Sequence, residues 1–149
     1  MRNQKMNLSM HSVEIQKSDS KESVLKKVAN SLFDDGMIED SSLFFTAAMQ
    51  RESLGNTHIG YGTALVHLIN QTVKQEGIFL YYFTSPLNHW HEDEMLPIKL
   101  AIVYAIHNEE SNNLMYFRKF SSLCADDQFI QQLIDKNLSI ETIKKYIFE

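Results

Sequence analysis

The chain places most of its backbone freedom between Arg51 and His67, where the sequence reads RESLGNTHIGYGTALVH. Three of its five glycines fall within eight positions of this stretch, namely Gly55, Gly60 and Gly62. Glycine allows positive φ and close backbone approach, which predicts a tight, irregular path before the apolar run that leads to His67. An arginine within reach of that imidazole would offer what a phosphoryl group needs. The stretch therefore predicts that His67 carries phosphate.

The composition is that of one ordinary globular domain. The 149 residues are 44% hydrophobic and 22% charged, which is enough for a core. A net charge of -5, without a stripe of lysine and arginine, argues against a nucleic-acid partner. The single cysteine, Cys124, excludes a disulfide framework and is expected in the core. No apolar run approaches the roughly 20 residues of a membrane-spanning helix. We expect a cytoplasmic protein with no direct membrane insertion and no cofactor.

Helical spacing of apolar residues and the capping residues before it predict five helices. The first follows Ser20 and ends near Gly36, and the second follows Asp40 and holds Arg51 in its last turn. The other three are expected over the ranges 114–124, 127–134 and 140–147. Residues 1–11 have no period and are expected to form a flexible N-terminus.

The strands are predicted from apolar and aromatic runs. Residues 13–15 are expected to form a short first strand, whereas 65–72 fit either the end of a strand or a short helix. The runs 78–83 and 98–106 indicate buried strands, and residues 85–88 indicate a turn. Because the run 98–106 is almost continuously apolar, helices are expected on both sides of the sheet. Strands separated by helices predict the α/β class.

Each candidate site residue also has a structural interpretation. A single histidine such as His67 is more often a hydrogen-bonded structural residue, Arg51 fits a solvated charge at a helix end, and Asn113 fits a helix cap. The two histidines of His89-Trp90-His91 precede three acidic residues at 92–94, which could suggest a metal site. Without further ligands we interpret this segment as a solvated polar turn and expect no bound metal.

The stretch from Arg51 to His67 carries most of a specific motif, R-E-[SA]-x-G-[ST]-x-x-G-x-G-x-A-x-P-H. The matching residues are Arg51-Glu52-Ser53, Gly55, Thr57, Gly60, Gly62, Ala64 and His67. Two further matches are Trp90 before the strand at 97–102 and the D-x-x-F pattern of Asp126-Asp127-Gln128-Phe129. On these residues the chain resembles the fructose/mannitol-type (type 2) EIIA domain of the bacterial phosphoenolpyruvate-dependent sugar phosphotransferase system. The resemblance covers roughly residues 12–148.

This resemblance implies a single EIIA type-2-like domain over residues 1–149, with three α/β/α layers around a central mixed β-sheet. It implies a phosphotransferase-type phosphocarrier that forms a phosphohistidine intermediate during sugar uptake. His67 would accept phosphate from the phosphohistidine of the carrier HPr and pass it to a cysteine of a IIB domain or subunit of a sugar permease. Arg51, Thr57 and Asn113 match positions that would bind the phosphate.

Three positions depart from the family pattern. Leu68 follows the active histidine, where a glycine or arginine is frequent. Val66 replaces the proline that usually precedes the active histidine, and Asn113 stands where a second active-site histidine is usual. Asparagine can donate a hydrogen bond to a phosphate oxygen but carries no positive charge. These departures motivate a second hypothesis, a catalytically impaired, regulatory EIIA-like binding module.

Overall fold

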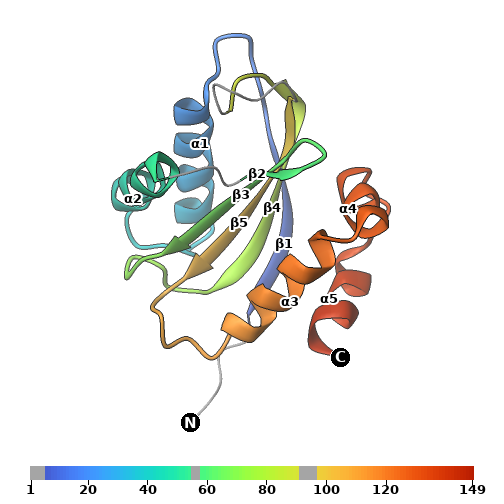
Figure 1. Cartoon of the computed structure of the whole chain (residues 1–149). Helices are drawn as coiled ribbons and strands as arrows, with labels where there is room; N and C mark the ends of the chain where they lie inside the picture. Colours follow the sequence, from blue (N-terminus) through green and yellow to red (C-terminus); the bar gives the residue numbers. More distant parts are fainter. Residues whose placement is uncertain (1–5, 55–57, 91–96) are drawn as a thin grey trace.

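A mixed β-sheet lies between two groups of helices (Figure 1). The computed structural model describes residues 6–54, 58–90 and 97–149. In this part of the chain the strands are β1 (Asn7–Val13), β2 (His58–Gly60), β3 (Thr63–Ile69), β4 (Gly77–Leu87) and β5 (Ile98–Ile106). Their order across the sheet is β1-β4-β5-β3-β2. The pairs β1–β4 and β3–β5 are parallel and the others antiparallel, which confirms the α/β class and the mixed sheet.

The helices follow the predicted capping residues. They are α1 (Lys21–Asp34), α2 (Ser41–Ser53), α3 (Leu114–Cys124), α4 (Asp127–Ile134) and α5 (Ile140–Phe148). The side chains of Ser20, Asp40, Asp126 and Ser139 each accept a hydrogen bond from a backbone N–H in the first turn of α1, α2, α4 and α5. These side chains satisfy donors that a helix start would otherwise leave unpaired. The helix predictions, including Arg51 in the last turn of α2, are confirmed.

Three strand predictions were wrong. Residues 7–11 do not form a flexible terminus, because β1 begins at Asn7 and pairs along its whole length with β4. Residues 85–87 continue β4 rather than forming a turn, and the strand expected at 13–15 instead ends at Val13, the last residue of β1. Residues 65–69 belong to β3, which decides between the strand and the helix that the sequence left open there. The polar residues of β1 gave little local signal, since pairing with a distant strand decides its conformation.

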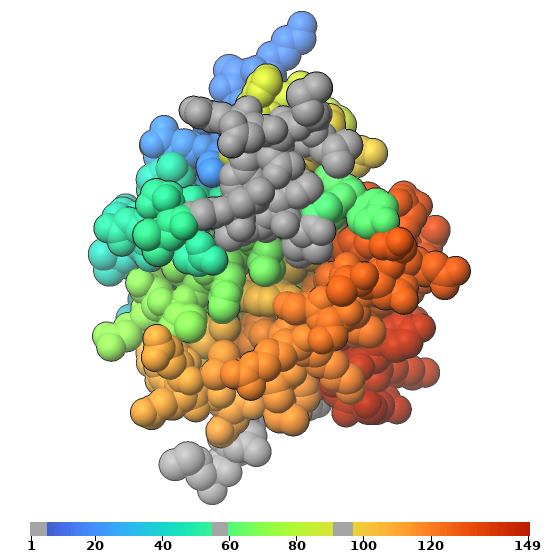
Figure 2. Space-filling view, in the orientation of Figure 1, coloured from blue at the N-terminus to red at the C-terminus, as the bar shows by residue number. Residues whose placement is uncertain are grey.

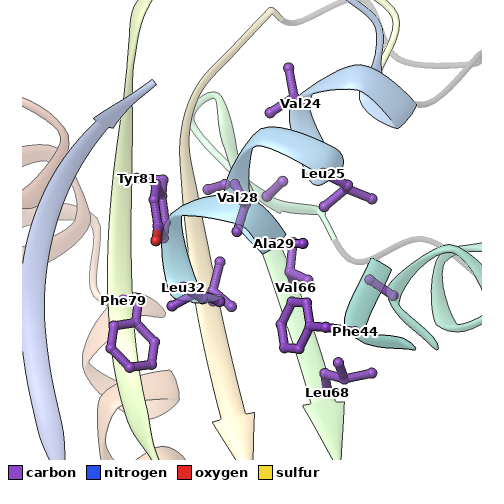
Figure 3. Close-up of a cluster of buried hydrophobic side chains, with 14 of the residues drawn as sticks. Val24, Leu25, Val28, Ala29, Leu32, Phe44, Val66, Leu68, Phe79 and Tyr81 are labelled. Atoms are coloured by element: carbon purple, nitrogen blue, oxygen red, sulfur yellow. The ribbon is translucent and has the colours of Figure 1, made fainter. Parts of the chain in front are cut away.

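The two faces of the sheet have separate hydrophobic cores. Alternation along β3 directs Ala64, Val66 and Leu68 toward α1 and α2, where Figure 3 shows Val66 and Leu68 beside Phe44. Leu65 packs on the opposite face, with the core beneath α3, α4 and α5. The same alternation in β5 explains its continuous apolar run, because both faces are buried. Cys124 is buried in the second core, as predicted.

The glycine-rich stretch forms the tight turn between β2 and β3. Gly60, Tyr61 and Gly62 have φ values of 110°, 56° and 78°. At Gly62 a Cβ atom would lie 2.8 Å from the carbonyl oxygen of Pro97, so both φ and space require glycine there. The Gly62 carbonyl accepts a 2.7 Å hydrogen bond from the Lys99 N–H, which ties the turn to the start of β5. Gly55 lies outside the described residues.

Thr63 holds an unpaired hydroxyl at the start of β3. Its side chain is fully buried, and its Oγ1 has no hydrogen-bond partner within the described part of the chain. A buried hydroxyl without a partner costs free energy, so Thr63→Val should raise the free energy of unfolding by about 1 kcal/mol. Denaturant unfolding measures the change. The control is Thr72→Val, because the buried Thr72 Oγ1 accepts a 2.9 Å bond from the Asp40 N–H. A stability loss at both positions would contradict the prediction.

Candidate active site

β3 delivers His67 to the sheet face that α3, α4 and α5 cover (Figure 1). His67 and Leu65 project to this face because they alternate with the buried residues of the opposite core. The parallel register places His67 beside Tyr104 of β5, and the two rings meet edge to face with centroids 5.9 Å apart. The His67 side chain is half-buried, so the imidazole is held by the protein yet still reaches solvent.

Arg51 acts on His67 through its charge. α2 packs against β3, and its last turn carries Arg51. Desolvation by burial, followed by the positive charge of Arg51, lowers the pKa of His67 below its ordinary value of 6.5. Both causes disfavour the imidazolium form, so His67 is mostly neutral at pH 7. The structure therefore brings together, within electrostatic reach, the first and the last residue of the sequence motif.

The imidazole of His67 and the guanidinium of Arg51 are available to a ligand. Within the described residues, neither ring nitrogen of His67 has a hydrogen-bond partner, and no carboxylate forms an ion pair with Arg51. A neutral imidazole with a free lone pair is a nucleophile, and a guanidinium without a carboxylate can receive an anion through paired N–H donors. Such a pair combines a nucleophile with a group that binds anions.

Glu52 anchors the end of α2 beside Arg51. Its side chain is buried, and its Oε1 accepts 3.3 Å hydrogen bonds from Lys21 Nζ and from Trp90 Nε1. The Lys21 ammonium also lies 5.9 Å from the centroid of the Trp90 ring. These contacts join the start of α1, the end of α2 and the segment after β4. They hold the turn that presents Arg51.

Asn113 is held by a carboxylate at the start of α3. Its Nδ2 donates a 2.8 Å hydrogen bond to Glu76 Oε1, which also accepts a 2.5 Å bond from the Ser111 hydroxyl. Glu76 Oε2 accepts a 2.8 Å bond from the backbone N–H of His107. Asn113 is the N-cap of α3 but makes no side-chain capping bond. One amide N–H of Asn113 is therefore used by Glu76, and the second can still reach a ligand.

A cleft of about 1090 Å³ lies at this end of the sheet. Asn113, Glu76 and His107 are among its lining residues, whereas His67 and Arg51 are not. Among the described residues, the side-chain amide of Asn113 therefore bonds Glu76 rather than His67 or Arg51. Of the other predicted site residues, Thr57 lies outside the described part of the chain.

The turn between β2 and β3 contacts the start of α4. Tyr61 is exposed at the tip of this turn, and a hydrogen bond to Asp127 at the start of α4 raises the pKa of the Tyr61 phenol. Figure 2 shows the green turn next to the orange helical region. The turn and α4 therefore contact each other near Thr63, where β3 begins.

The described part of the chain contains neither a candidate metal cluster nor a candidate membrane-spanning helix. Within the ranges 6–54, 58–90 and 97–149, no three histidine, cysteine or acidic side chains gather closely enough to hold a metal ion. The predicted polar turn at His89 is described only to Trp90, so His91 and the acidic residues at 92–94 lie outside the description. None of the described helices has the length and hydropathy needed to span a membrane.

Three residues that shape the site were not assigned a role from the sequence. Glu52 belongs to the motif, but its burial and its contacts to Lys21 and Trp90 depend on the fold. Tyr104 was hidden in a continuous apolar run, where only its hydroxyl marked it as different. Glu76 lies 37 positions from its partner Asn113, and no local pattern links them.

Comparison with known proteins finds one matching family model and relatives by sequence. Residues 6–149 match the family model described as "Phosphoenolpyruvate-dependent sugar phosphotransferase system, EIIA 2". The chain is 25% identical over 118 residues to the transcriptional regulator ManR of Bacillus subtilis (strain 168), covering 79% of this chain and 17% of ManR. It is 27% identical over 114 residues to the fructose-specific EIIABC component of Mycoplasma pneumoniae (strain ATCC 29342 / M129 / Subtype 1), covering 76% and 16%. The chain thus spans about a sixth of the length of these relatives.

Solved structures share the fold. The nitrogen regulatory protein IIA-Ntr of Neisseria meningitidis superposes with a TM-score of 0.67 at 18% identity, covering 92% of this chain and 88% of that one. The IIA mannitol protein of Escherichia coli gives 0.66 at 18% identity, covering 92% and 94%. The complex of IIAMTL and phosphorylated IIBMTL from Escherichia coli gives 0.62 at 16% identity, covering 93% of each chain. With the family match over nearly every residue, the chain belongs to the EIIA 2 family of the phosphoenolpyruvate-dependent sugar phosphotransferase system.

Proposed function

We propose that this chain is a phosphocarrier that accepts a phosphoryl group on His67 from the phosphohistidine of HPr and passes it to a cysteine of a IIB partner during sugar uptake. The observation that best supports this proposal is that His67 is half-buried and that desolvation and the charge of Arg51 lower its pKa, which favours the neutral imidazole. The family is one of phosphotransferase-type carriers that serve sugar uptake or regulation. A solved complex of IIAMTL with phosphorylated IIBMTL, which shares this fold, supports the class of acceptor.

In the proposed transfer, a ring nitrogen of neutral His67 attacks the phosphorus. The new P–N bond forms as the donor's P–N bond breaks, and the bonding electron pair goes to the donor imidazole. That ring gains a proton while His67 loses its N–H proton. Arg51 binds the equatorial oxygens through its planar fork. Thr57 and the second N–H of Asn113 would add further hydrogen bonds. In the next step a IIB thiolate attacks the phosphorus, the P–S bond forms as the P–N bond to His67 breaks, and the His67 imidazole takes the bonding electron pair and regains a proton.

Phosphorylation of the purified chain tests the proposal. After incubation with phosphoenolpyruvate, enzyme I and HPr, the intact mass of the wild type should rise by one phosphoryl group, and His67→Ala should not gain it. His89→Asn is the control, because His89 is exposed at φ 63° and asparagine tolerates that conformation. A wild-type chain that stays unmodified, while a mannitol-specific EIIA is phosphorylated in the same mixture, would contradict the proposal.

A regulatory role is the second candidate function. The bond from Asn113 to Glu76 favours it, because the amide in place of a second histidine is partly occupied by a neighbouring carboxylate. ManR, a relative by sequence, is a transcriptional regulator. In this case phosphate on His67 would change binding to a partner rather than move on to a IIB cysteine. Phosphorylation of His67 followed by slow or absent transfer to IIB would distinguish this role from the carrier.

A further inference from the structure

Tyr104 is the aromatic neighbour of the His67 imidazole. The two residues face each other on adjacent parallel strands, with ring centroids 5.9 Å apart and planes at 71°. Within the described residues, no hydrogen bond fixes either nitrogen of the imidazole. In many proteins the orientation of a functional histidine is set by a hydrogen bond to its second nitrogen. Here the orientation of the ring must come from packing.

Tyr104 is itself held from three sides. Its ring packs against Phe117 at 5.0 Å and Phe120 at 6.2 Å between centroids. Its hydroxyl forms a 2.8 Å hydrogen bond with the Ser121 hydroxyl, and its side chain is only 3% exposed. Burial raises the pKa of the Tyr104 phenol, so the hydroxyl stays protonated. A rigid ring of this kind can fix its neighbour, whereas its hydroxyl, already bonded to Ser121, is not aimed at a phosphoryl group.

We propose that Tyr104 is a positioning residue that holds the His67 imidazole in the orientation from which it reacts, and that Phe117 and Phe120 of α3 hold the Tyr104 ring in turn. The inference rests on the proposed phosphorylation of His67. It assigns a role to a contact that no sequence motif marks. The two rings meet edge to face, so Tyr104 restricts the orientations that are open to the imidazole.

A loosely held imidazole would spend less time aligned with the phosphorus. Misplacement of a reacting group by about 1 Å can cost about 100-fold in rate. Replacing Tyr104 by a flexible, non-aromatic side chain should therefore slow phosphoryl transfer from phospho-HPr to His67 by at least about tenfold. Tyr104→Phe keeps the ring and should stay within about threefold of the wild type. Ser121→Ala should behave like Tyr104→Phe, because it removes the same hydrogen bond.

The experiment compares Tyr104→Met and Tyr104→Leu with a matched replacement elsewhere. Tyr82→Leu is the control, since Tyr82 is also a buried tyrosine of the same core, and its hydroxyl bonds the Leu133 carbonyl at 2.7 Å. Rates of single-turnover transfer from phospho-HPr are measured together with the NMR titration of the His67 ring. We expect slow transfer and a His67 pKa closer to 6.5 in the Tyr104→Met and Tyr104→Leu variants. Tyr82→Leu and Tyr104→Phe should resemble the wild type.

Each outcome decides the inference. Wild-type rate and titration in Tyr104→Met would overturn it, and so would an equal loss of rate in Tyr82→Leu, which would indicate general destabilisation. If Tyr104→Leu does not fold, the comparison of Tyr104→Met with Tyr104→Phe still decides. If the wild type accepts no phosphate, the proposed function fails on its own, and the titration of His67 alone tests whether Tyr104 controls the ring.

Discussion

Arg51→Ala is expected to slow phosphoryl transfer to His67 by about 30-fold to 1000-fold, which corresponds to about 2–4 kcal/mol in the barrier. The guanidinium is the positive charge that acts on His67, and no carboxylate of the described residues pairs with it. It would balance the charge of the transferring group in a half-buried setting, where such interactions are strong. Single-turnover transfer from phospho-HPr measures the rate.

Two variants separate charge from geometry in this prediction. Arg51→Lys keeps the positive charge but loses the planar fork, so it should recover part of the rate. Arg118→Ala removes an exposed arginine of α3 and should leave the rate unchanged. An Arg51→Ala protein that transfers phosphate at the wild-type rate would remove Arg51 from the proposed site.

The same variant should change the pH dependence. The charge of Arg51 contributes to the lowered pKa of His67, so Arg51→Ala should raise that pKa toward 6.5. Only the neutral ring attacks phosphorus. The rate should therefore fall, on acidification, at a higher pH in Arg51→Ala than in the wild type. NMR titration of the His67 ring gives the pKa directly. A shift to lower pH would contradict the electrostatic link.

Glu52→Ala is expected to lower the free energy of unfolding by about 3 kcal/mol. The Glu52 side chain is 2% exposed, and its carboxylate accepts hydrogen bonds from Lys21 and from the indole N–H of Trp90. Alanine would leave the indole N–H without its acceptor where Trp90 is 2% exposed, and would leave the ammonium without its anion. Denaturant unfolding followed by fluorescence is a direct measurement, because Trp90 is the single tryptophan of the chain.

Conservative and exposed replacements sharpen the Glu52 prediction. Glu52→Gln keeps an oxygen acceptor for Trp90 and should cost about 1 kcal/mol. Glu22→Ala removes an exposed acid from the first turn of α1 and should change stability by no more than about 0.5 kcal/mol. If Glu52→Ala were as mild as Glu22→Ala, the contacts to Lys21 and Trp90 would not anchor the end of α2.

Local patterns predicted the helices more accurately than the strands. Ser20, Asp40, Asp126 and Ser139 marked helix starts because an N-cap acts within its own first turn. The start of β1 and the end of β4 were missed, since a strand is stabilised by partners far away in the chain. The short strand β2 was hidden inside the glycine-rich stretch for the same reason.

The amino-acid order alone was enough to predict the α/β class, the helix boundaries and the role of glycine in the turn before β3, because these depend on interactions within a few residues. It also singled out His67 and Arg51 as a candidate pair. The tertiary structure decided what surrounds them: Tyr104 against the imidazole, Trp90 and Lys21 on Glu52, and Glu76 on Asn113. Strand register and helix packing bring these distant side chains together, and no local periodicity in the sequence predicts these contacts.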